Sequence, residues 1–206
     1  GNGAIALGAL AAGVNLVAGY PGTPSSEILE TISKYRHDGV YIEWSVNEKA
    51  AMEVAAAAAY SGARAMVTMK QVGLNVAADP LMSLAYVGVK GGMVIVSADD
   101  PGPISSQTEQ DTRRFADFCR IPAFDPSSPE EAYKMIGEAF EYSEKYNTPV
   151  LFRPTTRVCH AYASIDNCDS PSPKKYEGFV KDSKKWVIFP RLSFANHIMI
   201  EKRNVE

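Results

Sequence analysis

The side chain best placed for chemistry in this sequence is a lone carboxylate at the start of an alanine-rich segment. The segment, residues 46–64, reads VNEKAAMEVAAAAAYSGAR, and its carboxylate is Glu48. Asn47 is a favourable N-cap residue and Ser61-Gly62 end the pattern, so a helix is expected from Lys49 to Tyr60. Alanines allow this helix to pack closely on neighbouring backbone, which would hold the carboxylate where it can act on a bound ring. The simpler interpretation is a first-turn glutamate that the helix dipole favours.

The elements around Glu48 follow an alternating pattern of short β-branched runs and longer helical stretches. Strands are expected over residues 15–20, 40–43, 65–69, 93–97 and 150–153. Helices are expected over residues 4–12, 25–35, 47–60, 80–87, 110–118 and 129–146, with Thr23-Pro24 and Ser128-Pro129 as capped starts. The alternation predicts right-handed βαβ units, and therefore an α/β fold with a doubly wound, mostly parallel sheet and helices on both faces.

The expected elements all lie within residues 1–160, which are interpreted as one domain. From Asp166 onward the chain becomes polar and loses clear periodicity, so residues 161–206 are interpreted as a linker and the start of a truncated following region. The apolar residues near the end are expected to dock on another part of the protein. The sequence begins without Met and without the pattern of a secretory signal, which suggests a piece of a longer protein.

The composition argues against several classes of protein and of site. A net charge of −3 offers no broad basic face for nucleic acid, and no apolar run approaches the roughly 20 residues that span a bilayer. The three cysteines form no CxxC pair and the three histidines lack metal-binding spacing, so no metal site is expected in this chain. Reduced thiols and a cytoplasmic location are the default expectation.

Ligands bind beyond the carboxyl ends of the strands in a doubly wound sheet, and four loops are expected there. They cover residues 19–26, 44–48, 70–75 and 98–114, and the last loop is long, polar and structured by prolines. Each can also be an ordinary turn or a solvated surface loop. No loop carries a Walker sequence, a G-x-G-x-x-G turn or a G-x-S-x-G elbow, which disfavours dinucleotide binding and serine hydrolysis.

Together these loops resemble the pyrimidine-binding domain of thiamine-diphosphate enzymes. AGYPGTPSSEI (18–28) is similar to the first-loop motif of the acetolactate synthase group, and residues 46–64 resemble the motif that carries the superfamily's activating glutamate. The runs EWSVNEK, VTMKQVGLNVAADPLMSLAYVGVKGG, DDPGPISSQTEQDTR and LFRPTTRV resemble one branch more closely, the alpha subunit of indolepyruvate:ferredoxin oxidoreductase. The resemblance extends over the whole chain and is strong from residue 16 to residue 158.

The resemblance implies roles for particular residues. It makes Glu48 the catalytic residue, a carboxylate that hydrogen-bonds N1′ of the cofactor's aminopyrimidine and tunes the base that the cofactor itself carries. The other residues implied to contact the cofactor are Tyr20, Pro21, Gly22, Val72, Gly73 and Asn75. The residues implied to contact the substrate are Thr23, Gln107, Gln110 and Arg114.

The reaction implied for the intact enzyme is oxidative decarboxylation of an aryl pyruvate such as indolepyruvate, with coenzyme A as acyl acceptor and ferredoxin as electron acceptor. The implied partners are a diphosphate-binding domain of the same subunit, a beta subunit, ferredoxin and a second pyrimidine domain in a homodimer. Thiamine diphosphate would be shared with the diphosphate-binding domain. Mg²⁺ and a [4Fe-4S] cluster would belong to the missing parts, so this fragment alone is expected to bind the cofactor poorly and to have no turnover.

Two departures from the family pattern and two alternative functions remain open. Ile104 stands where a histidine is expected, which can alter loop chemistry or substrate fit, and Gly3 stands where a glutamate is expected. A non-oxidative enzyme of the acetolactate synthase type would also use Glu48, but its full-length gene would encode a central domain instead of a cysteine cluster. A non-catalytic α/β module would use the alanine-rich helix as a subunit interface and would tolerate glutamine at position 48.

Overall fold

The computed structural model describes residues 1–36, 38–166 and 172–205, so His37 and Cys168 lie outside the described residues. Within these ranges six strands form one sheet, parallel throughout, in the order β2-β1-β3-β4-β6-β5. The strands are β1 (Leu16–Gly19), β2 (Tyr41–Trp44), β3 (Ala65–Lys70), β4 (Met93–Ala98), β5 (Ala123–Phe124) and β6 (Val150–Phe152). The predicted α/β class and doubly wound, parallel sheet are therefore confirmed.

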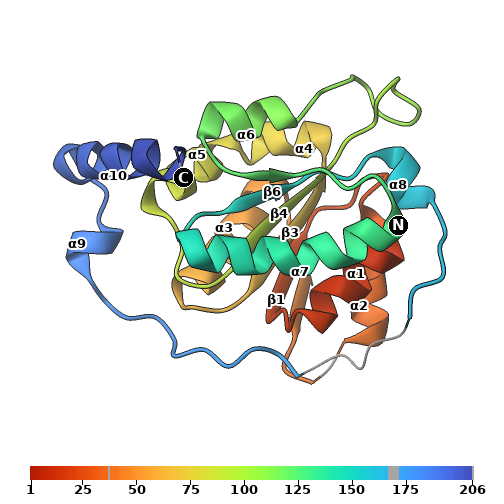
Figure 1. Cartoon of the computed structure of the whole chain (residues 1–206), viewed down its shortest axis with the longest axis horizontal. Helices are drawn as coiled ribbons and strands as arrows, with labels where there is room; N and C mark the ends of the chain where they lie inside the picture. The colour runs from red at the N-terminus through yellow and green to blue at the C-terminus, as the bar shows by residue number, and fades with distance from the viewer. Residues whose placement is uncertain (37, 167–171, 206) are drawn as a thin grey trace.

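Helices cover both faces of the sheet (Figure 1). One face is packed by α1 (Asn2–Ala11), α2 (Ser26–Tyr35) and α7 (Pro129–Tyr146). The opposite face is packed by α3 (Glu48–Tyr60), α4 (Gln71–Val76), α5 (Ala78–Val87) and α6 (Arg113–Cys119). Successive strand residues point to opposite faces, so Val17 belongs to the first apolar cluster and its neighbour Ala18 to the second. After β6 the chain forms α8 (Thr156–His160), α9 (Ser183–Trp186) and α10 (Pro190–Arg203).

The alanine-rich helix α3 lies against the central strands β1 and β3. Ala51, Ala55 and Ala59 are fully buried there, because only a methyl group separates the helix from the sheet. The predicted cap is confirmed: Asn47 Oδ1 accepts a hydrogen bond from the Ala50 amide at 2.9 Å. Cap and packing together fix Glu48, the first helical residue, at the carboxyl edge of the sheet.

One of the two predicted proline-containing helix starts is confirmed and the other is wrong. Ser128 caps α7, and its hydroxyl accepts a hydrogen bond from the Glu131 amide. Thr23-Pro24 does not start a helix, because α2 begins at Ser26. The loop instead turns back on Gly22, whose amide donates to Ser26 Oγ at 2.8 Å and whose carbonyl accepts from Ser25 Oγ at 2.9 Å. Because these contacts hold residues 22–26 in a turn, the helix begins after the proline.

The predicted turn over residues 70–75 is also wrong, because α4 begins directly after β3. A glycine early in a short segment argues against a helix on propensity alone. Tertiary packing overrides it here: Leu74 is fully buried in the apolar cluster beneath α3. Val72, Gly73 and Asn75 therefore lie on a helix instead of a loop. The strand β5 was missed because two residues are too few to show a period.

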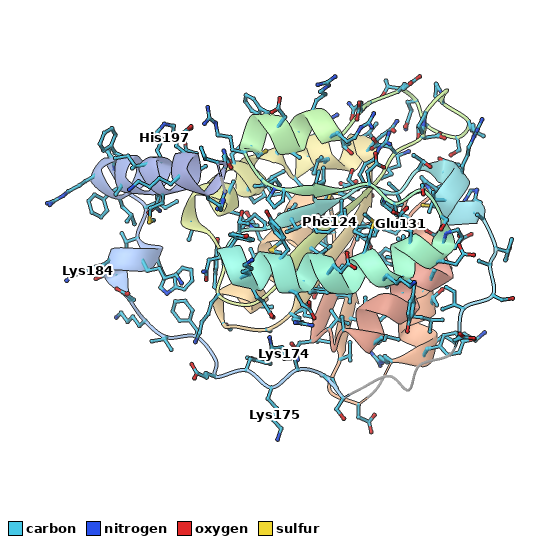
Figure 2. The ribbon with its side chains drawn as sticks, in the orientation of Figure 1. Phe124, Glu131, Lys174, Lys175, Lys184 and His197 are labelled. Atoms are coloured by element: carbon cyan, nitrogen blue, oxygen red, sulfur yellow. The ribbon has the colours of Figure 1, made fainter. Side chains whose placement is uncertain are left out.

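The segment after residue 171 contacts the body of the protein at several places, near its start and near its end. The Asn15 side-chain amide donates to the Lys174 carbonyl at 2.7 Å, and the Lys174 ammonium pairs with Glu144 on α7, also at 2.7 Å. Figure 2 shows Lys174 on this extended segment beneath α7. The apolar end docks through α10, where the Asn196 amide donates to the Tyr86 carbonyl at the end of α5. The domain boundary near residue 160 stays a prediction.

None of the helices in the described residues has both the length and the apolar character needed to cross a lipid bilayer.

The ion pair of Arg64 with Glu144 yields a prediction about acid stability. Both guanidinium contacts are 2.9 Å long. Burial opposes ionisation of Glu144, but hydrogen bonds from Arg64 and Lys174 outweigh it and lower the pKa to about 2. Because the folded pKa is depressed, the stabilisation is complete above the ordinary glutamate pKa near 4.5 and is lost as the pH falls toward 2.

We therefore expect Glu144→Gln to lower the free energy of unfolding at pH 7 by about 1–3 kcal/mol. The difference from the unsubstituted protein should shrink as the pH falls from about 4.5 to about 2. Urea unfolding at a series of pH values measures both effects. Glu141→Gln, at an exposed position on the same helix, is the matched control. A difference that does not change with pH would contradict the assignment.

Candidate functional site

The candidate site lies where the chain changes direction across the sheet. Gly19, the last residue of β1, pairs with Trp44 of β2 on one side and with Thr68 of β3 on the other. The chain leaves β1 toward β2 and then returns to β3 on the opposite side, so the topological switch point lies between β1 and β3. Ligands of doubly wound proteins bind outside the carboxyl ends of the strands at such a point.

Glu48 is a nearly buried carboxylate at this edge, with 9% of its surface exposed. Its side chain packs against the backbone of α4: a Cβ added at Gly73 would lie 2.5 Å from Glu48 Oε1 and 2.7 Å from Cγ. Only glycine at position 73 leaves room for the carboxylate. Within the described residues, Glu48 makes no side-chain hydrogen bond and no ion pair. A buried carboxylate without a partner is costly, so this one is suited to a donor that a ligand supplies.

The loop after β1 lies beside the end of β3. The Tyr20 amide donates to the Thr68 carbonyl at 3.2 Å, which continues the ladder beyond Gly19. Pro21 and Thr23 are exposed. A Cβ added at Gly22 would lie 2.8 Å from Lys70 Cδ, so this glycine admits the lysine stem against its backbone.

Gln71 joins the start of α4 to the long loop after β4. Its side chain is fully buried; Oε1 accepts from the Asp100 amide at 2.7 Å and Nε2 donates to the Thr108 carbonyl. The neighbouring Lys70 ammonium donates to Gln107 Oε1 at 3.1 Å. The loop, which projects at the upper right of Figure 1, is therefore tied at Asp100 and at residues 107–108 to the end of β3 and the start of α4.

Asp100 organises the same loop from inside. Its Oδ2 accepts from the amides of Ile104, Ser105 and Ser106 at 2.8–2.9 Å, and its Oδ1 accepts from Thr156 Oγ1 at 2.7 Å. Burial opposes ionisation of Asp100, but these hydrogen bonds outweigh it and lower its pKa to about 2. The carboxylate therefore holds the loop in its folded form at neutral pH.

Asp99 anchors the base of the loop to β6. Its Oδ2 accepts from Arg153 Nε at 2.7 Å and from the Thr112 amide at 3.0 Å. Burial raises the pKa of Asp99, and the hydrogen bonds from Arg153 and Thr112 oppose that rise. Asp99 thus fixes the far end of the loop through Thr112, whereas Asp100 fixes residues 104–106 within it.

The structure brings together only some of the residues that the sequence proposed. Glu48 meets Gly73, Gly22 meets Lys70, and Gln107 meets Lys70. Gln110 Oε1 is buried without a hydrogen-bond partner among the described residues.

Apart from Gly73, none of the proposed residues is joined to Glu48 by a described contact. Thr23, Asn75 and Arg114 are exposed, and Val72 lies half-buried on α4. The Arg114 side chain, on the first turn of α6, makes no ion pair in the described part of the chain.

Sequence reasoning missed Lys70, Gln71 and Asp100 as functional positions. Lys70 and Gln71 were included only as parts of an expected turn. The available signal was position along the chain. Lys70 and Gln71 lie at and directly after the end of the mostly apolar strand β3, and Asp99-Asp100 directly follow β4. Which partners these side chains meet depends on segments about 30 residues away in the chain.

Other cavities and clusters do not compete with this site. A cavity of about 680 Å³ lies between α5 and α10, but the ends of α5 and α7 that line it place it near the opposite edge of the sheet. Among the residues that the structure describes, no group of His, Cys, Asp and Glu is arranged to hold a metal ion.

We expect Asp100→Asn to loosen the loop over residues 101–111, because an amide is a weaker acceptor for three backbone amides than a carboxylate is. Cleavage within the loop by a broad-specificity protease, mapped by mass spectrometry, should rise on the order of tenfold, since local opening becomes easier. Asp117→Asn, at an exposed position on α6, is the control. Equal cleavage of both variants would show that Asp100 does not hold the loop.

Comparisons with known proteins agree with this fold. The family model described as pyruvate flavodoxin/ferredoxin oxidoreductase, thiamine diP-bdg, matches residues 7–187. A solved structure of 2-oxoglutarate:ferredoxin oxidoreductase from Magnetococcus marinus superposes with a TM-score of 0.68, covering 77% of this chain and 29% of that chain. At 19% identity, this likeness supports the fold alone.

Two curated relatives share more of the sequence. Indolepyruvate oxidoreductase subunit IorA of Thermococcus kodakarensis is 48% identical over 206 residues, which are 97% of this chain and 32% of the relative. The 2-oxoglutarate synthase subunit KorA of Methanocaldococcus jannaschii is 30% identical over 205 residues, which are 93% of this chain and 55% of the relative. The chain spans about a third of the length of the first relative. Because the family model covers most of its residues, the chain belongs to the thiamine-diphosphate-binding domain family of the pyruvate flavodoxin/ferredoxin oxidoreductases.

Proposed function

We propose that this chain binds the aminopyrimidine of thiamine diphosphate in an oxidoreductase that decarboxylates aryl pyruvates such as indolepyruvate. Coenzyme A would accept the acyl group and ferredoxin the electrons. The observation that carries the proposal is Glu48, a nearly buried carboxylate without a described partner at the switch point of the sheet. The names of the relatives support the oxidative reaction over a non-oxidative one of the acetolactate synthase type.

The residues present fit the cofactor. Glu48 lacks the hydrogen-bond donor that a protonated ring nitrogen provides, and the missing Cβ at Gly73 gives its carboxylate room at this position. When bound, thiamine diphosphate would supply a nucleophilic carbon and an electron sink for decarboxylation of a 2-oxo acid. Glu48 would hold the proton shared with N1′, and the tightly packed alanines of α3 would keep water from it.

The remaining residues of the proposed site flank Glu48. Tyr20, Pro21 and Gly22 follow β1, and Val72, Gly73 and Asn75 lie on α4; these six residues would border the cofactor ring. The residues proposed for the substrate are Thr23, Gln107, Gln110 and Arg114. Gln107 has the strongest support of these, because Lys70 holds its side chain next to the end of β3.

The proposed assembly follows from the relatives, which are named as subunits. A diphosphate-binding domain, a beta subunit and ferredoxin would complete the enzyme, with Mg²⁺ and a [4Fe-4S] cluster outside this chain. Residues 1–160 would form the cofactor-binding unit and pair with a second copy, and residues 161–206 would lead away from it. We place the enzyme in the cytoplasm because Cys119 and Cys159 are buried as free thiols.

A non-catalytic interface module is the second candidate, and the unpaired Glu48 argues against it. An interface helix gains nothing from a nearly buried carboxylate that lacks a partner, because its desolvation is unfavourable. Val46, which is 84% exposed, lies just before α3 and is compatible with either function.

In the assembled enzyme, Glu48→Gln should lower kcat roughly a hundredfold to ten-thousandfold, because a positioned acid–base group contributes on that scale. Reduction of ferredoxin or a viologen dye with indolepyruvate and coenzyme A, without oxygen, measures this rate. Glu53→Gln, at an exposed position on the same helix, should leave it unchanged. Full activity of Glu48→Gln would remove Glu48 from the mechanism.

Gly73→Ala should also reduce kcat, by on the order of tenfold or more, because the new methyl group displaces the Glu48 carboxylate. Gly137→Ala is the matched control: no atom lies within 4 Å of its added Cβ on α7. That variant should keep its activity and unfold with a free energy higher by about 0.5–1 kcal/mol. Equal activity of the two variants would mean that the Glu48–Gly73 contact does not matter for turnover.

A further inference from the structure

Lys70 ends β3 at the switch point and is held there by two loops. Its stem lies along the backbone of the loop after β1, because a Cβ added at Gly22 would lie 2.8 Å from its Cδ and 3.0 Å from its Cγ. Its ammonium donates to Gln107 Oε1, in the loop after β4, at 3.1 Å. The charge of Lys70 therefore has a defined place between the two loops, instead of moving freely in solvent.

That charge has no acidic partner in the described part of the chain, where its side-chain contact is the neutral amide of Gln107. Lys49, Lys90 and Lys174 differ, because each pairs with a carboxylate, at 2.8, 3.0 and 2.7 Å respectively. An ammonium group has three donors, so Lys70 retains donors for a further acceptor. A half-buried cation with free donors is suited to an anion that is not part of this chain.

We propose that Lys70 binds the carboxylate of the 2-oxo acid, with Gln107 as its neighbour in that contact; this rests on the function proposed above. The substrate has one carboxylate next to the carbonyl that reacts, so a fixed cation at the start of α4, the helix that packs on Glu48, orients both groups. Because Gln107 Oε1 accepts from Lys70, its amide nitrogen is left to donate to the same carboxylate.

Gln71 keeps this pair of donors together. Its buried side chain bonds to the Asp100 amide and the Thr108 carbonyl, at the two ends of the loop that carries Gln107. The residue directly after Lys70 in the chain thus holds Gln107 within reach of the Lys70 ammonium.

The test uses the assembled enzyme with bound cofactor and compares Lys70→Met, Lys70→Arg and Lys34→Met with the unsubstituted protein. Methionine preserves the stem that lies against Gly22 and removes the charge. Arginine restores the charge, and Lys34→Met removes the same charge from an exposed position on α2. Thermal unfolding of all variants shows whether each is folded.

For Lys70→Met, the KM for indolepyruvate should rise roughly tenfold to a hundredfold, the range expected for losing one hydrogen bond to a charged group. We expect kcat to change much less, Lys70→Arg to recover much of the loss and Lys34→Met to match the unsubstituted enzyme. An unchanged KM in an active Lys70→Met enzyme would overturn the proposal while leaving the proposed function intact.

A binding measurement separates recognition of the carboxylate from a structural effect. By calorimetry, the unsubstituted enzyme should bind indole-3-propionate roughly tenfold or more tightly than the neutral indole-3-propionamide. Lys70→Met should bind the two compounds about equally, whereas a structural defect would weaken both alike and overturn the proposal.

The diphosphate of the cofactor is the other anion that Lys70 could bind. If Lys70→Met weakens binding of thiamine diphosphate and keeps the preference for the acid over the amide, the diphosphate is the ligand and the proposal is wrong. If the unsubstituted enzyme turns over no aryl pyruvate, the proposed function is wrong. The comparison of the acid with the amide measures binding and not turnover, so it still tests whether Lys70 binds a carboxylate.

Discussion

The contact between Glu48 and the backbone at Gly73 is the constraint on which the site depends. It requires three things of the sequence at once. Helix α3 must lie close to β1 and β3, which its buried alanines permit. Helix α4 must start directly after β3, so that its first turn reaches the start of α3. Position 73 must lack a side chain, since any Cβ would lie 2.5 Å from a carboxylate oxygen. The unfavourable glycine in a short helix is therefore explained by the carboxylate beside it.

The distribution of satisfied and unsatisfied charge distinguishes the site from the rest of the protein. Asp99, Asp100 and Glu144 are buried or half-buried, and each accepts several hydrogen bonds from described partners. Glu48 makes no described hydrogen bond and Lys70 donates only to the neutral amide of Gln107, although both lie at the carboxyl edge of the sheet, Glu48 after β2 and Lys70 at the end of β3. They carry opposite charges and yet form no ion pair with each other. Two separate, uncompensated charges of opposite sign suit a ligand pair with a protonated ring nitrogen at one point and a carboxylate at another.

The sequence predicted what depends on local signals and failed where distant contacts decide. The alternation of strand-like and helix-like segments was enough to predict the α/β fold. Asn47 and Ser128 were predicted correctly as caps because a cap involves neighbouring residues only. Helix α4 could not be predicted, since its stability comes from burial of Leu74 beneath α3. Likewise, nothing near Gln71 in the sequence indicates that its amide joins Asp100 to Thr108. Glu48 was identified because its helix is unusual by itself, whereas Lys70 needs the structure.

Ile104 illustrates how a departure from a family pattern can leave a loop intact. The contact at this position that holds the loop is its backbone amide, which donates to Asp100 at 2.9 Å, and its side chain is 71% exposed. Any residue except proline can make that backbone contact, so isoleucine in place of the expected histidine does not disturb the fold of the loop. The side chain is exposed on a loop tied to Lys70 and Gln71, so it does not hold the loop and is open to a ligand or a partner. An effect of Ile104 on substrate fit stays a prediction: an apolar group there favours an apolar surface, where histidine would offer a hydrogen bond.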